Sequence, residues 1–161
     1  MVQNRPDAIN VHGAMCFGES IEFTIGVHPA TGGTTHDMNA WHSEKFTNDK
    51  TGLVTVPCKS VAGILQENRI SNIDVFFVDV EGAELTVLTT IDWTAVTIGM
   101  FIVEMNGTDP NKDEAVRAVL KAHGYVKPFR FLDECLKRKE NCVNNEIFAL
   151  PDYIQSITTQ A

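Results

Sequence analysis

Hydrophobic and polar residues alternate along the first part of the chain, as they do in strands with one buried face. The alternation is weak over residues 8–14 and clear over residues 20–26, and it predicts a strand in each segment. Residues 28–51 are rich in Gly, Thr, Asn, Asp and His, so we expect a long surface loop there. Another short strand is predicted at residues 53–57.

The middle of the chain has the strongest pattern. Residues 73–80 form a near-continuous run of β-branched and aromatic residues, which is typical of a strand that is covered on both faces. Before this strand, Ser60 is a suitable N-cap for a short helix. After it, Gly82 breaks the run and residues 83–90 have helical spacing. The order predicts a buried strand with a helix before and after it.

The same order of strand and helix then repeats. Residues 98–105 predict a second buried strand, and Asp109–Pro110 is a typical helix start, with the acid as N-cap and the proline at the first helical position. Two more strands are predicted at residues 125–131 and 146–150. Because no long helix separates them, we expect an antiparallel hairpin at one edge of the sheet.

Together these elements predict one α/β domain spanning residues 1–161. Strands that alternate with helices favour an open, doubly wound and mostly parallel sheet, here a partial Rossmann-like fold with a C-terminal antiparallel hairpin. The chain has 161 residues, 43% of them hydrophobic, which is enough for a core.

The charge balance excludes one class of partner. The formal net charge is -8, from 13 Lys+Arg against 21 Asp+Glu, and no basic run interrupts it. Nucleic acid is therefore not an expected partner, because phosphate binding requires a positive surface. No stretch approaches the ~20 apolar residues of a membrane span, so no membrane segment is expected in this chain.

The four cysteines leave two interpretations open. They show no Cys-x-x-Cys spacing, so a metal site is not expected. They are either buried free thiols, as in a cytoplasmic protein, or two disulfides that would place the protein in the secretory pathway. The disulfides would be Cys16–Cys58 and Cys135–Cys142.

Carboxylates gather where the two buried strands end. Asp79 and Glu81 follow the first strand, and the strand period places them on the same side, while Gly82 permits a sharp turn. Glu104 ends the neighbouring strand. Because ligands of open α/β sheets bind beyond the carboxyl ends of the strands, Asp79, Glu81 and Glu104 are the candidate catalytic residues. Glu84 is better explained by the dipole of the helix that it begins.

The run from Ile73 to Leu88, with its Asp-x-Glu-Gly-x-Glu after a hydrophobic strand, resembles the signature of FkbM-type methyltransferases. The resemblance continues in order through Val103–Asn106 and Leu120–Tyr125 and covers about residues 5–150. It implies a class I methyltransferase fold and S-adenosylmethionine as cofactor. It also implies O-methylation of a hydroxyl on a small molecule or glycan.

The resemblance also suggests residue roles. Asp79 and Glu81 would lie beside the sulfonium and the acceptor hydroxyl, and Asp79 would also bind the cofactor. The residues at the end of the first predicted strand would lie beside the adenine of the cofactor. Gly13, Ala14 and Met15 are therefore further candidate cofactor-binding residues. In the predicted long loop, three side chains are candidates for contacting a sugar acceptor: His36, Trp41 and His42.

One expected feature of the family is missing from this sequence. No glycine-rich loop follows a hydrophobic strand near the N-terminus. We therefore expect an N-terminally truncated domain that lacks two strand–helix units, on the order of 50 residues. The strand at residues 73–80 would then have an open edge, which a homodimer is expected to cover.

Two other functions stay open on the sequence alone. One is a non-catalytic interaction module with the methyltransferase fold, in the secretory pathway if Cys16 and Cys58 are oxidised. The other is a metal-dependent hydrolase that holds Mg²⁺ or Mn²⁺ with Asp79, Glu81 and Glu104.

Overall fold

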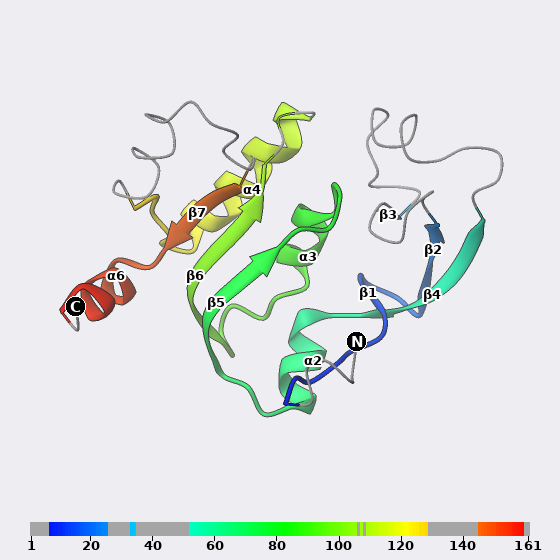
Figure 1. Cartoon of the computed structure of the whole chain (residues 1–161), viewed down its shortest axis with the longest axis horizontal. Coiled ribbons are helices and arrows are strands. Elements are labelled where there is room, and N and C mark those ends of the chain that lie inside the picture. The colour runs from blue at the N-terminus through cyan, green and yellow to red at the C-terminus, as the bar shows by residue number, and fades with distance from the viewer. Residues whose placement is uncertain are drawn as a thin grey trace.

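The structure is a computed structural model, and it combines two small sheets with helices (Figure 1). It describes residues 7–25, 33–34, 52–105, 107, 109–128 and 145–159. The α/β class predicted from the sequence is confirmed. Among the helices of these ranges, none combines the length and the apolar character needed to cross a membrane.

The first sheet has the strand order β1-β4-β2-β3. β1 pairs parallel with β4, whereas β2 pairs antiparallel with both β4 and β3. The clear alternation over residues 20–26 and the pattern over residues 53–57 correctly predict β2 and β4. The strands are β1 (Ala14–Met15), β2 (Ser20–Thr24), β3 (Gly33–Thr34) and β4 (Leu53–Lys59).

The strand predicted at residues 8–14 is wrong for most of its length, because only Ala14 joins a ladder. Ala14 pairs with Cys58, so the preceding pair would have to use Pro57, which has no N–H to donate. The ladder therefore ends there, and the weakly alternating side chain of Ile9 stays 62% exposed.

The second sheet has the order β5-β6-β7. β5 and β6 pair parallel, as predicted for the two buried strands, and β7 pairs antiparallel with β6. Helix α3 crosses over between β5 and β6, as a parallel pair of consecutive strands requires. The strands are β5 (Asn72–Val78), β6 (Thr97–Glu104) and β7 (Asn145–Ala149).

Two details of the predicted fold need correction. The expected mostly parallel sheet is not found in the described ranges, where both sheets are mixed and three of the five strand pairings are antiparallel. This follows from the first sheet, whose strands are joined without crossover helices.

The expected C-terminal antiparallel hairpin is found only in part within the described residues. Residues 125–128 contribute one antiparallel bridge, from Val126 to Ala149, and residues 129–131 lie outside the described ranges. Pro128 cannot donate to a ladder, and β7 instead pairs along β6, where Phe148 lies opposite Phe101 and is buried.

Three of the four helices in the described ranges begin where the sequence predicts. Ser60 caps α2 by accepting the Gly63 N–H at 3.0 Å. Asp109 caps α4 by accepting the N–H groups of Asn111 and Lys112. The fourth helix, which starts with Pro151, is missed by the sequence analysis. The helices are α2 (Val61–Glu67), α3 (Glu84–Thr89), α4 (Pro110–Ala122) and α6 (Pro151–Thr159).

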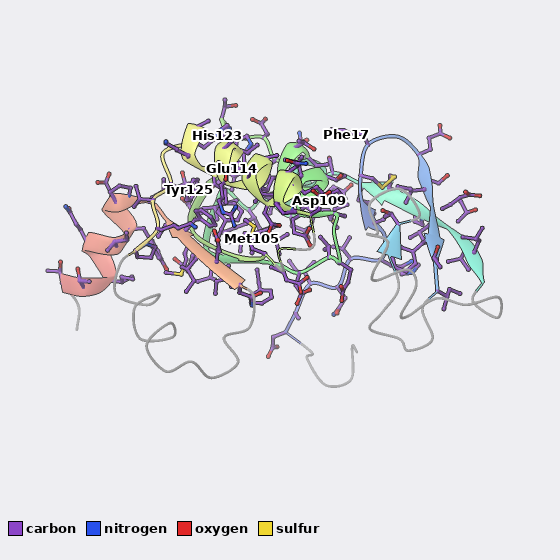
Figure 2. The ribbon with its side chains drawn as sticks, turned by 90° about the horizontal axis from the view of Figure 1, so that it is seen from above. Phe17, Met105, Asp109, Glu114, His123 and Tyr125 are labelled. Atoms are coloured by element: carbon purple, nitrogen blue, oxygen red, sulfur yellow. A yellow bond between two sulfur atoms is a disulfide. The ribbon has the colours of Figure 1, made fainter. Side chains whose placement is uncertain are left out.

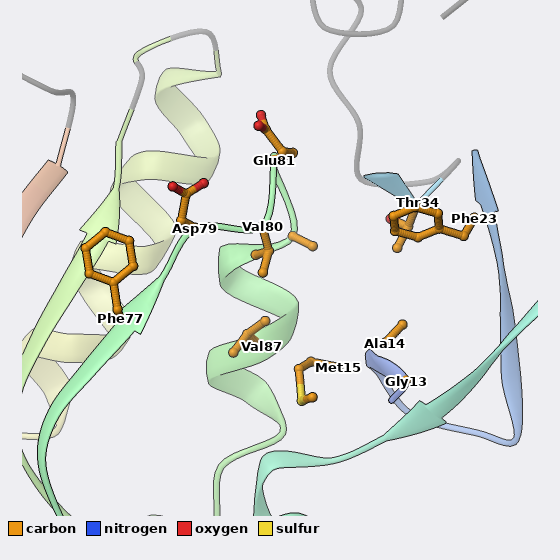
Figure 3. A pocket seen from close by; sticks show the side chains of 11 residues that line it. Gly13, Ala14, Met15, Phe23, Thr34, Phe77, Asp79, Val80, Glu81 and Val87 are labelled. Atoms are coloured by element: carbon orange, nitrogen blue, oxygen red, sulfur yellow. The ribbon is translucent and has the colours of Figure 1, made fainter. Parts of the chain in front are cut away.

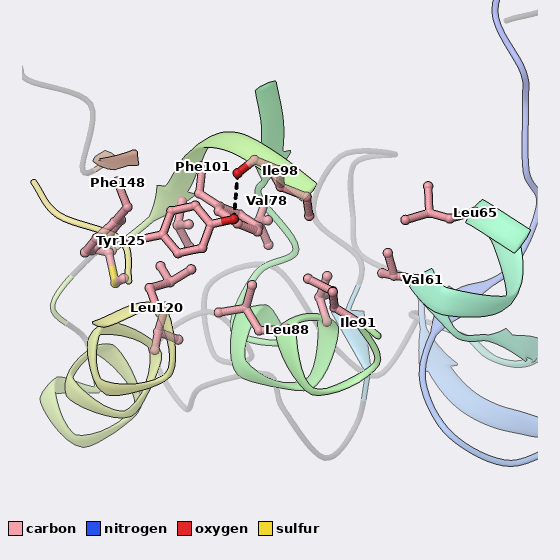
Figure 4. Packing of buried hydrophobic residues seen from close by; sticks show 14 residues of the cluster. Val61, Leu65, Val78, Leu88, Ile91, Ile98, Phe101, Leu120, Tyr125 and Phe148 are labelled. Carbon is pink, nitrogen blue, oxygen red and sulfur yellow. Dashed lines mark hydrogen bonds between the residues drawn. The ribbon is translucent and has the colours of Figure 1, made fainter. Parts of the chain in front are cut away.

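The hydrophobic core lies between the second sheet and helices α3 and α4, which cover the same face of that sheet (Figure 2). Phe101 and Leu88 are fully buried there, and the Tyr125 hydroxyl donates to the Ile98 carbonyl oxygen at 2.6 Å (Figure 4). The Val75 and Phe77 side chains share one face of β5 and are about half exposed, so the expected cover on both faces is wrong for this strand in the described residues. β5 also pairs on one side only within the described ranges. The open edge that the sequence predicts is therefore present in this part of the chain.

A disulfide joins the end of β1 to β4 through Cys16 and Cys58. Of the two interpretations of the cysteines, the disulfide holds for this pair. Cys135 and Cys142 lie outside the described residues.

Candidate functional site

A cavity of about 760 Å³ lies between the carboxyl end of β5 and the first sheet (Figure 3). The candidate residues that line it come from distant parts of the sequence: Gly13, Ala14, Met15, Asp79 and Glu81. Glu104 is not among the lining residues, although it ends the strand next to Asp79. The structure thus brings five of the six candidate site residues to one cavity.

The turn after β5 holds its acidic residues in an unusual backbone conformation. Glu81 has a φ of 55°, and Gly82 follows with a φ of 107°. A left-handed conformation at a residue with a side chain costs on the order of 1 kcal/mol or more, so the surrounding structure must maintain it. Such residues cluster at functional sites, and here the turn directs Glu81 to the rim of the cavity (Figure 3).

Glu84 supports this turn from the first position of α3. Its side chain is 8% exposed, and its Oε1 atom accepts the N–H of Gly82 at 3.1 Å and the N–H of Val80 at 3.4 Å. From α4, Lys112 Nζ donates to the Gly82 carbonyl oxygen at 3.1 Å. From the sequence, Glu84 is expected only to interact favourably with the dipole of the helix that it begins. Its hydrogen bonds show that it also fixes the shape of the turn.

Glu104 lies partly buried at the end of β6, and its environment is strongly acidic. Burial is the largest cause that raises the pKa of its carboxyl group, and together with the nearby negative charges of Asp79, Glu81, Glu84 and Asp113 it brings that pKa to about 7. Its Oε2 atom is buried and accepts no hydrogen bond from the residues that the structure describes. A carboxyl group with this pKa exchanges a proton near neutral pH, which suits acid–base chemistry.

The opposite wall of the cavity is the backbone around β1. A side chain at Gly13 would place its Cβ atom 2.9 Å from the Pro57 carbonyl oxygen, so only glycine lets the chain run this close to β4. Met15 packs against the hydrophobic core, and in Figure 3 its side chain lies near Val87 of α3. This wall is therefore apolar, whereas the wall at the end of β5 carries negative charge.

Sequence reasoning does not identify the other side chains of the cavity. Phe77 precedes Asp79 by two residues, so the strand period places both on the same side of β5, and this signal was available. Phe23 and Thr34 lie opposite each other in the antiparallel pair of β2 and β3, and β3 falls within the segment expected to be a loop. The candidate loop residues His36, Trp41 and His42 lie outside the described ranges.

The cavity suits a cationic organic ligand better than a metal ion. Among the residues that the structure describes, no three His, Cys, Asp or Glu side chains lie close enough to hold a metal. Carboxylates on one wall and apolar groups on the other favour a ligand with a positive charge and an apolar ring.

Comparison with known proteins gives one match. Residues 10–127 match a family described as the methyltransferase FkbM domain. None of the curated proteins and none of the solved structures is similar enough to the chain to count as a match. The matched residues include both walls of the cavity.

Proposed function

Because the chain belongs to the FkbM methyltransferase family, we propose that it transfers a methyl group from S-adenosylmethionine to a hydroxyl of a small molecule or glycan. The observation that supports this proposal most is the cavity with Asp79 and Glu81 on one wall and Gly13–Met15 on the other. We further propose that the described elements are part of a Rossmann-like class I methyltransferase fold.

The residues of the cavity fit this cofactor in size and chemistry. A volume of about 760 Å³ lies in the range of small-molecule sites. The apolar wall at Gly13, Ala14 and Met15 would contact the adenine ring, and the carboxylate of Asp79 would contact the polar part of the cofactor. When bound, the cofactor supplies a methyl group carried on a positively charged sulfur.

In this proposal, three carboxyl groups of the chain position the acceptor hydroxyl and accept its proton. Asp79 and Glu81 hold the acceptor hydroxyl in line with the methyl group, since alignment supplies much of the rate of a group transfer. A carboxylate oxygen of Glu81 or Asp79 accepts the hydroxyl proton as the oxygen is methylated. Glu104, with its pKa of about 7, takes that proton on Oε2 or returns it to solvent.

Calorimetric titration with S-adenosylhomocysteine tests the cofactor site. We expect binding by the unmodified chain and binding about tenfold weaker or worse in the Asp79→Asn variant, because a charge-assisted contact is lost. Asp74→Asn is the matched control, since Asp74 is an exposed carboxylate of the same strand and does not line the cavity. Equal affinities in the two variants would contradict the assigned site.

The exposed Val75 and Phe77 favour a second candidate function, a non-catalytic interaction module whose open β5 edge pairs with a second copy of the chain. Analytical ultracentrifugation separates the two candidates. A dimer that dissociates in the Val75→Lys variant, together with no binding of S-adenosylhomocysteine by the unmodified chain, would favour the module.

A further inference from the structure

The β1 wall of the cavity is held by few backbone contacts. β1 is an edge strand of two residues, and its parallel ladder to β4 has two pairs, Ala14 with Cys58 and Met15 with Lys59. The Cys16 N–H adds one hydrogen bond to the Lys59 carbonyl oxygen at 3.2 Å. The facing wall belongs to β5, which forms six register pairs with β6. The two walls of one cavity therefore differ greatly in how firmly their backbones are fixed.

The disulfide lies immediately beside the weakly held wall. Cys16 follows Met15 directly and is bonded to Cys58, the β4 residue that pairs with Ala14. The bond links positions 42 residues apart, so it closes a long loop that includes β2 and β3. Breaking such a link returns chain entropy to this part of the molecule and leaves β1 with its few backbone contacts.

The disulfide is also accessible to a small reductant. A hollow of about 390 Å³ lies on its other side and is lined by Cys16, Cys58 and Ser60, among others. Cys16 is buried, at 5% exposed, whereas Cys58 is partly exposed, so Cys58 is the sulfur that a small thiol in the hollow would approach first.

We propose that the Cys16–Cys58 disulfide is a redox-sensitive clamp that holds the Gly13–Met15 wall against the cavity. In the oxidised chain the wall is fixed and the cavity binds its ligand; in the reduced chain the wall loosens and the ligand is bound weakly. The nature of that ligand, though not the clamp itself, rests on the proposed function.

The chemical step is ordinary thiol–disulfide exchange with a dithiol reductant. A thiolate of the reductant attacks one protein sulfur, which forms a mixed disulfide and releases the other cysteine as a thiolate. The second thiol of the reductant then displaces the remaining protein sulfur. Two electrons reduce the protein to two thiols, and the reductant leaves as a cyclic disulfide.

Amide hydrogen exchange in the oxidised and the dithiothreitol-reduced chain tests the clamp without any ligand. We expect exchange at residues 14–16 to become about tenfold faster or more on reduction, while exchange in β5 and β6 stays unchanged. The Cys16→Ser/Cys58→Ser variant should behave as the reduced chain under both conditions. The Cys135→Ser/Cys142→Ser variant should respond to dithiothreitol like the unmodified chain, because it retains the clamp.

Titration with S-adenosylhomocysteine in both redox states completes the test. We expect affinity to fall about fivefold or more on reduction, since a loosened wall must be reordered on binding. Unchanged exchange at residues 14–16, equal affinity in both states, or faster exchange throughout β5 and β6 would each overturn the clamp. If the ligand binds in neither state, the proposed function fails, and the exchange data alone decide on the clamp.

Discussion

The β5–β6–β7 sheet buries Phe101, Val103 and Phe148 against helices α3 and α4, whereas the β1–β4–β2–β3 sheet leaves Leu53 61% and Ile25 46% exposed. Burial of a large apolar side chain contributes about 1.5–3 kcal/mol, so the β5–β6–β7 sheet has a source of stability that the β1–β4–β2–β3 sheet lacks. The other sheet has the Cys16–Cys58 disulfide instead.

Each sheet supplies one wall of the cavity, so the difference in packing between the sheets is also a difference between the two walls. The acidic wall is attached to a packed core and keeps its shape through the hydrogen bonds of Glu84 and Lys112. The apolar wall is attached to a covalent link and a short ladder. In the proposed function, the reacting groups are therefore placed on the wall attached to the core, and the wall at Gly13–Met15 would contact the rest of the ligand.

The largest effect on stability is expected from truncating a side chain of the hydrophobic core. Phe101→Ala should lower the free energy of unfolding by about 3–5 kcal/mol, because Phe101 is fully buried among Phe76, Trp93 and Tyr125. Urea denaturation measures the loss. Leu53→Ala, on the exposed sheet, should change the same quantity by about 0.5 kcal/mol or less. Similar losses in both variants would mean that the two sheets do not differ as described.

Reduction of the disulfide should have the next largest effect. We expect the free energy of unfolding of the β1–β4–β2–β3 sheet, which the bond closes, to fall by about 2–4 kcal/mol for a loop of this length, while the β5–β6–β7 sheet keeps its own. Urea denaturation with and without dithiothreitol measures it, with the Cys16→Ser/Cys58→Ser variant as the reductant-insensitive control. A loss of similar size in that control on adding reductant would assign the effect to other groups.

Glu104 should make stability depend on pH. Its folded-state pKa of about 7 lies above the ordinary value of 4.5, so the carboxyl group favours folding when protonated. That contribution is complete below about pH 4.5 and is lost as the pH rises through about 7. Glu104→Gln should therefore be more stable than the unmodified chain at pH 8, by about 1–2 kcal/mol after solvent screening. Thermal unfolding at pH 5 and pH 8 checks the sign, and equal differences at both pH values would contradict it.

The smallest effect is expected at the helix that connects the two sheets. Ser60→Ala removes the cap of α2 and should cost about 1 kcal/mol. Ser20→Ala, at an exposed position of β2, serves as the control and should leave the unfolding midpoint nearly unchanged. Chemical denaturation of the two variants in parallel makes the comparison.

Elements with strong local patterns are predicted from the sequence in both sheets, including β2 and β4 of the exposed one. The runs that become β5 and β6 and the Asp109–Pro110 helix start are local signals, and the structure confirms them. The strands expected at residues 8–14 and 125–131 depend on distant partners, and Pro57 and Pro128 withhold the donors that their ladders need.

The same distinction applies to the candidate site. The acidic residues are visible in the sequence because they follow a strong strand. The support that Glu84 gives to the turn, and the arrival of Phe23 and Thr34 from other strands, depend on tertiary contacts that no local pattern encodes. The missed helix α6 begins with Pro151 and has Asp152 in its first turn, so a start signal for it was present in the sequence.

In the proposed site, one ligand, S-adenosylmethionine or its product, contacts both walls of the cavity. Two-dimensional NMR of the amide groups during titration with S-adenosylhomocysteine shows which walls the ligand contacts. We expect saturable shifts at Ala14 and Met15 together with Glu81 and Gly82, and no shift at Val126. Shifts on one wall only, or no shift on either wall at saturating ligand, would contradict it.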